Sequence, residues 1–223
     1  MDSKYIIDRK SNFFLINKPS NIFFNEVNIL SPQLQNFVTC HRLDHPTSGL
    51  LLLSLEQHKS KYLELFKRQS PQAHKLKKTY LCWTQHKLNA DLLNQAINGF
   101  TVARYRSSKK THFKLELPQK KQFHSYQACA HLITNYKNKN DYFKEFSKYN
   151  CYQIELITGT RHQIRSFFAW AKCPLVGDVL YNGLIDPSIN SLGLHSFALE
   201  FEDPYDHSFY SFKSLEKLNF EGN

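Results

Sequence analysis

A carboxylate in a turn marked by proline and glycine stands directly before a run of four leucines. The segment reads HRLDHPTSGLLLL and covers residues 41–53. Pro46 and Gly49 indicate the turn, and residues 50–53 predict a short strand that is buried on both faces. Asp44 is therefore expected at the edge of a hydrophobic core, where a partly buried carboxylate needs a cation. A second distinctive segment, GTRHQIR at residues 159–165, opens a predicted helix and offers such cations.

Composition suits a polyanionic partner and an intracellular setting. The 29 Lys and Arg residues against 19 Asp and Glu give a net charge of +10, which favours nucleic acid; a solubility role for a Lys- and Asn-rich chain is the plainer alternative. The five cysteines include no Cys-x-x-Cys pair, so we expect neither a disulfide framework nor a zinc site, and a reducing cytoplasm. We expect no membrane segment and no signal peptide.

Periodicity predicts more strands than helices. Strands are expected at 13–17, 50–54, 78–84, 126–135, 149–157, 192–201 and 209–212, and helices at 57–69 and 162–171. Residues 86–124 carry little pattern and a cationic cluster of Arg104, Arg106, Lys109 and Lys110, which is either a phosphate contact or a solvated loop. Without regular alternation of strand and helix, the fold class is α+β with a mixed, largely antiparallel sheet. We expect one catalytic domain over residues 1–223 and no separate accessory RNA-binding domain.

The ordered motifs resemble those of the RluA-type RNA pseudouridine synthases. HRLD with TSG at 41–49 resembles that family's catalytic loop, and residues 156–165 followed by PLVGD at 174–178 and Tyr181 resemble its second diagnostic segment. Smaller matches occur in the same order at 17–20, 78–80 and 194–196. The match leans toward the subgroup that modifies tRNA. The resemblance implies an extended sheet with a central RNA-binding cleft, a uridine-to-pseudouridine isomerase, no cofactor and no metal.

Three residues would form the catalytic centre by this resemblance. Asp44 would be the catalytic carboxylate, Arg165 would pair with it, and Tyr80 would pack on the target base. Each has a plainer interpretation: a turn or helix cap for Asp44, a surface arginine for Arg165, and a core tyrosine for Tyr80.

Seven further residues are predicted to bind structured RNA, either tRNA or rRNA. In the family the arginine at the position of Arg42 is associated with displacement of the base, and the other six would contact the same RNA: Lys18, His41, Lys78, Arg161, His162 and Gln163. We expect a monomer without an obligate protein partner.

Two departures from the family pattern affect substrate contacts. Thr160 stands where the family commonly has arginine, and NIFF at residues 21–24 replaces the more usual Gly-rich continuation after Lys-Pro-Ser. The catalytic pair is expected to be unaffected, whereas the contacts made by these two segments do not transfer from the family.

Two other functions compete with the isomerase. His41, Asp44 and His45 resemble a metal-ligand set, but Pro46 and Gly49 interrupt a helix there and no third His or Cys ligand has recognisable spacing. The stronger rival is an RNA-binding or RNA-folding protein on the same fold that has lost turnover. Both this rival and an enzyme would bind RNA, and they differ in whether Asp44 is needed for product.

Overall fold

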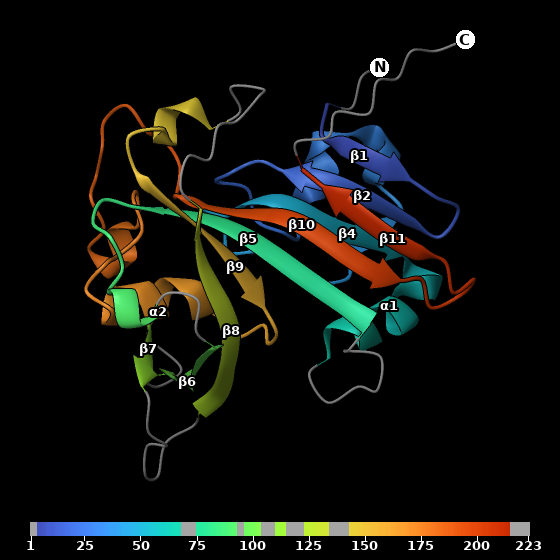
Figure 1. Cartoon of the computed structure of the whole chain (residues 1–223). Helices are drawn as coiled ribbons and strands as arrows, with labels where there is room; N and C mark the ends of the chain where they lie inside the picture. The colour runs from blue at the N-terminus through green and yellow to red at the C-terminus, as the bar shows by residue number, and fades with distance from the viewer. Residues whose placement is uncertain are drawn as a thin grey trace. The chain divides into compact units, whose positions relative to one another are not determined.

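In the described part of the chain, the computed structural model contains two groups of antiparallel strands, each with one α-helix (Figure 1). The structure describes residues 4–67, 75–92, 96–103, 110–114, 123–133 and 143–214. The first unit combines residues 1–78 with 196–223, and the second comprises residues 79–195. Each unit is described by itself.

The first unit is built on the predicted leucine strand. Strand β4 (Ser48–Leu55) pairs antiparallel with β2 (Phe13–Lys18), which in turn pairs with β1 (Ile6–Arg9). The short β3 (Phe37–Thr39) also pairs with β4. On the other side of β4 lies β10 (Leu194–Glu202), which pairs with β11 (Phe209–Lys213). In this register Lys18 is opposite Gly49, so the turn that carries Asp44 enters β4 beside the end of β2.

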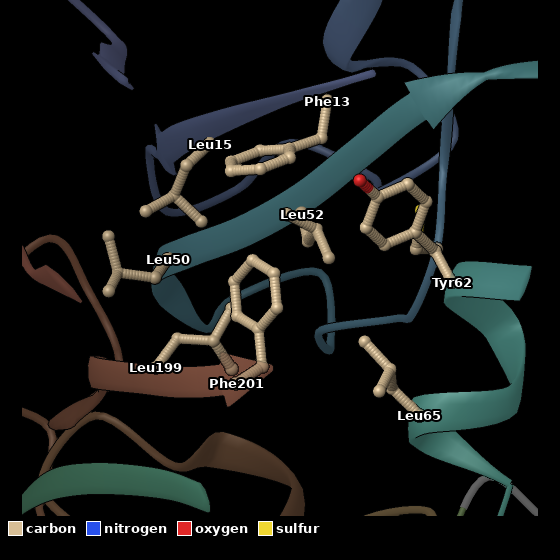
Figure 2. Packing of buried hydrophobic residues seen from close by; sticks show 9 residues of the cluster. Phe13, Leu15, Leu50, Leu52, Tyr62, Leu65, Leu199 and Phe201 are labelled. Carbon is tan, nitrogen blue, oxygen red and sulfur yellow. The ribbon is translucent and has the colours of Figure 1, made fainter. Parts of the chain in front are cut away.

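Alternate residues of these strands form a core under helix α1 (Lys59–Phe66). All four leucines at 50–53 are fully buried, which confirms a strand covered on both faces. One face packs with α1, as Figure 2 shows, in a cluster that includes Phe13, Leu15, Leu50, Leu52, Tyr62, Leu65, Leu199 and Phe201. The Tyr62 hydroxyl donates a 2.5 Å hydrogen bond to buried Asp203, which ties α1 to the end of β10.

The second unit is a five-stranded antiparallel series. Its order is β5 (Leu76–Thr84), β9 (Asn150–Leu156), β8 (Phe123–Ile133), β6 (Ala96–Ala103) and β7 (Thr111–Lys114). Helix α2 (Gln163–Trp170) packs against β7, where the rings of Phe113 and Phe167 meet edge to face at 5.4 Å.

Short 3-10 helices connect these elements: η1 (Val27–Leu30), η2 (Pro32–Leu34), η3 (Glu56–His58), η5 (Ala90–Leu92), η6 (Lys144–Phe146) and η7 (Val179–Tyr181). The predicted α+β class with a largely antiparallel sheet is confirmed. Of the predicted cationic cluster, Arg104, Arg106 and Lys109 lie outside the described residues. None of the helices in the described ranges has the length and apolar character needed to cross a membrane.

Candidate functional site

The turn between β3 and β4 presents Asp44 at the edge of the first unit's core, as predicted. Asp44 is half-buried, and its backbone oxygen accepts a 3.0 Å hydrogen bond from the N–H of Thr47. Gly49 ends the turn with φ +110°, and a Cβ there would lie 2.3 Å from the backbone oxygen of Ser196. Only glycine accepts both that backbone conformation and that close approach, so Gly49 fixes where the turn joins the sheet.

Lys18 supports this turn through hydrogen bonds to backbone oxygens. Its side chain is fully buried, and Nζ donates to three backbone oxygens, of Pro19 (2.9 Å), Ile22 (2.8 Å) and His45 (3.2 Å). Burial lowers the pKa of Lys18 to about 8, although the charge of Asp44 acts in the opposite direction. The geometry gives Lys18 the role of a buried cation that joins the residues after β2 to the residue after Asp44. An RNA contact by Lys18 stays a prediction.

His41 supports the other end of the same turn. Its Nε2 accepts a hydrogen bond from the N–H of Leu52 at 3.0 Å, and its ring stacks on Phe66 with the centroids 4.3 Å apart. Burial, followed by the nearby charge of Lys78, lowers the pKa of His41 to about 3. His41 is therefore a neutral imidazole that ties the turn to β4 and α1. Its predicted RNA contact remains untested.

Arg42, in contrast, is exposed beside Asp44. Its guanidinium lies over the ring of Phe24 at 5.7 Å from the centroid. This placement suits the predicted contact with RNA, because the cation reaches solvent while an aromatic face limits its freedom.

Strand β5 carries Lys78 and Tyr80, both almost buried at 9% and 7% exposure. Burial lowers the pKa of Lys78 to about 8. Two other lysines at the start of the same strand differ from it, because Lys75 and Lys77 are paired with Glu202 and Glu200. Tyr80 pairs with Ile154 of β9 in the strand register.

In the second unit, Arg165 of α2 makes a buried bidentate ion pair with Asp178. Its Nε and Nη2 each donate to one carboxylate oxygen of Asp178 at 2.8 Å, and the two side chains are 6% and 0% exposed. The guanidinium also lies over the ring of Tyr181 at 5.3 Å. Asp178 begins η7 and accepts from the backbone N–H of Tyr181. This pairing fixes the orientation of Arg165, whereas its predicted pairing with Asp44 stays a prediction.

The residues before α2 are fixed by hydrogen bonds of their own. The Gln163 side-chain oxygen accepts from the N–H of Thr160 at 3.0 Å and from the hydroxyl of Thr158 at 3.1 Å. His162 adopts a left-handed conformation, with φ 54°, and its Nδ1 lies 3.1 Å from the Tyr181 hydroxyl. Arg161 is exposed. Of the three RNA-binding residues predicted here, Gln163 is buried and shapes the turn, His162 is partly exposed, and Arg161 is the most exposed.

Comparison with known proteins supplies the family. A model of the family described as RNA pseudouridylate synthase matches residues 4–170. The chain belongs to the RNA pseudouridylate synthase family. It is 26% identical over 217 residues to an uncharacterized RNA pseudouridine synthase of Mycoplasma capricolum, covering 88% of this chain and 65% of that protein. It is 29% identical over 161 residues to tRNA pseudouridine synthase C of Yersinia pestis, covering 67% of this chain and 54% of that protein.

Solved structures agree on the fold. Human RNA Pseudouridylate Synthase Domain Containing 1 superposes with a TM-score of 0.68 at 18% identity, over 96% of this chain and 84% of that one. Human RNA Pseudouridylate Synthase Domain Containing 4 gives a TM-score of 0.63 at 20% identity, over 89% and 84%. At these identities the likeness concerns the fold alone.

Two supports of this candidate site are not apparent from the sequence. The sequence places Asp178 in a family segment but does not indicate that it pairs with Arg165. It also does not indicate that Tyr181 contacts the turn before α2. A signal was present, because a buried aspartate in PLVGD needs a cation and Arg165 lies on a helix with a buried face. The three backbone oxygens that bind Lys18 could not be predicted in this way, because every residue has a backbone oxygen whatever its type.

Proposed function

We propose that this chain isomerises uridine to pseudouridine in structured RNA. The observation that supports this most is the place of Asp44 within a family of pseudouridylate synthases: a half-buried carboxylate in a turn held by Lys18, His41 and Gly49. A side chain held by rigid neighbours meets the need of catalysis for a preorganised group.

The chemistry demands little beyond such a group. The C1′–N1 bond breaks, the freed uracil rotates, and a C1′–C5 bond forms, so no atom is gained or lost and no electrons are transferred to a cofactor. The Asp44 carboxylate can attack C1′, attack C6 of the base, or take the C2′ proton. In all three routes the reaction begins at the same carboxylate and needs no cofactor or metal.

Arg165 and Tyr80 complete the proposed centre. A guanidinium has five N–H donors, so binding of Asp178 through Nε and Nη2 is compatible with a second carboxylate, which we take to be Asp44. Tyr80, almost buried in β5, would stack on the uracil and is the proposed carrier of the C5 proton.

Transfer RNA is the first substrate to test. Relatives from Yersinia pestis and Salmonella typhi are named tRNA pseudouridine synthase C, and the net charge of +10 suits any folded RNA. The target uridine must leave its stack to reach a half-buried carboxylate. We place this activity in the cytoplasm, in a monomer.

The test is to incubate purified protein with unmodified tRNA and rRNA transcripts and to map pseudouridine by carbodiimide adducts. Wild-type protein is expected to modify at least one uridine. Asp44→Asn should abolish product, by a factor of about 1,000 or more, because the amide lacks the negative charge and the nucleophile. Its affinity for the same RNA should change less than about threefold, since phosphate contacts dominate binding.

Asp206→Asn is the matched control. Asp206 is an exposed aspartate in the loop before β11, and its loss should leave product formation unchanged. If wild-type protein binds these RNAs but forms no pseudouridine in any of them, the isomerase proposal is wrong and an RNA-binding protein without turnover is the better description.

A further inference from the structure

The residues after β2 give this chain an aromatic pair beside the Asp44 turn. Phe23 is 50% exposed, which is unusual for so large an apolar side chain. Its ring packs on the ring of His45, with the centroids 4.3 Å apart. Phe24, the next residue, lies under the guanidinium of Arg42. Two consecutive aromatic residues thus contact the residue that follows Asp44 and a residue two positions before it.

This segment is fixed to the turn by hydrogen bonds. The N–H of Asn21 donates to the backbone oxygen of His45 at 3.0 Å, and the Ser20 hydroxyl donates to that of Pro46 at 2.6 Å. Lys18 bridges the same two segments through Ile22 and His45. Because the Phe23 ring contacts the tilted ring of His45 and the segment is bonded to the turn, the exposed part of the Phe23 ring is preorganised for a ligand.

The chemistry of the surroundings indicates the ligand. An exposed aromatic face beside an exposed arginine, on a chain of net charge +10, fits a nucleobase on a phosphate backbone, which binds by stacking and by charge together. A uridine that leaves its stack also deprives its neighbour of a stacking partner. An aromatic ring that packs against His45, the residue after Asp44, can replace that partner.

We propose that Phe23, supported by His45, stacks on the nucleobase next to the target uridine, and that Phe24 holds Arg42 beside it. This inference rests on the proposed function and adds a substrate contact made by the NIFF segment, which differs from the usual family pattern. Phe23 acts in binding, and Phe24 is a positioning residue for Arg42.

The test uses an RNA stem-loop with one uridine in its loop and a neighbouring 2-aminopurine, whose fluorescence is quenched by stacking. Binding is measured in an Asp44→Asn background, so that no product forms. Phe23→Leu keeps the apolar bulk but lacks the aromatic face, and it should bind about tenfold more weakly and lose the quenching. Phe23→Trp should keep both.

Phe209→Leu is the matched control, because Phe209 is another exposed phenylalanine, at 67%, on β11. It should bind and quench like the unaltered protein. A probe with an abasic site in place of 2-aminopurine should bind the Phe23→Leu variant and its parent equally well, since no base is left to stack. A comparison of the two probes with the parent protein alone serves if Phe23→Leu folds poorly. The parent should bind the abasic probe about tenfold more weakly than the 2-aminopurine probe.

The proposal is overturned if Phe23→Leu binds and quenches as Phe209→Leu does, or if the parent does not discriminate against the abasic probe. Either result leaves the isomerase proposal intact when wild-type protein forms pseudouridine in a transcript. Conversely, if stacking depends on Phe23 but the wild-type protein never forms pseudouridine, the stacking proposal is supported and the isomerase proposal is contradicted.

Discussion

Lys18 shows how a single residue can have a structural role that the sequence does not indicate. The sequence places a lysine in a motif next to a proline, and the natural expectation for a basic protein is a contact with phosphate. In the structure its ammonium is directed to three backbone oxygens and none of its surface reaches solvent. The charge matters for the turn that carries Asp44, and this leads to a dependence on pH.

We expect the rate at saturating RNA to fall as the pH rises through about 8, the pKa of Lys18. The neutral amine has two N–H donors for three carbonyl oxygens, so one link to the turn is lost. If only the charged form is competent, kcat falls by up to about tenfold per pH unit above that pKa. Lys18→Met should have a low kcat without this alkaline limb, measured from single-turnover rates between pH 6.5 and 9.5.

The contribution of Lys18 to the free energy of unfolding should rise over the pH range in which kcat falls. The pKa of Lys18 is lower in the folded chain than its ordinary 10.5, so between about pH 8 and 10.5 the unfolded chain binds more protons at this residue. Its contribution to the free energy of unfolding therefore rises with pH. A loss of kcat that tracks a loss of folded protein, or a wild-type kcat that is flat through pH 9, would contradict the assigned role.

At the scale of elements, the strands with many apolar residues were predictable, whereas several of the others were not. The leucine strand, β5, β9 and β10 lie within a few residues of their predicted ranges because burial on one or both faces imposes a pattern on the sequence. β6 and β7 lie in the part predicted to be without pattern, and β3 has only three residues. Strands as short as β3 and β7 carry too few alternating positions to be recognised.

The connection between α2 and η7 depends on the Arg165–Asp178 pair, and Asp178→Asn should show this. The neutral amide no longer offers a carboxylate to Nε and Nη2 of the buried Arg165, with an expected loss of about 3–5 kcal/mol in the free energy of unfolding. Glu56→Gln is the matched control: it breaks the exposed pair with Lys59, which should cost at most about 1 kcal/mol. Urea denaturation measures both, and equal losses would contradict the structural role given to the buried pair.

At the scale of the whole molecule, the ordered motifs predicted the family and the fold class, and both are confirmed. The supports of the site were harder to predict. His41 and Gln163 are predicted to contact RNA because their side chains are polar. In the structure each of them also makes hydrogen bonds within its own unit, which the sequence does not indicate. The sequence assigns no role to Phe23 and Phe24, and in the structure they contact the turn of Asp44, with Phe23 50% exposed. The type of a residue indicates which interactions it can make, and the neighbours that the fold gives it determine which of them it makes.

The most direct test of the central claim is a comparison of pseudouridine maps of cellular RNA with and without this gene. We predict that one or a few uridines lose their modification, and that wild-type protein restores it whereas Asp44→Asn at the same protein level does not. Identical maps with and without the gene, or restoration by the Asp44→Asn variant, would contradict the assignment of Asp44 as the catalytic carboxylate of a uridine isomerase.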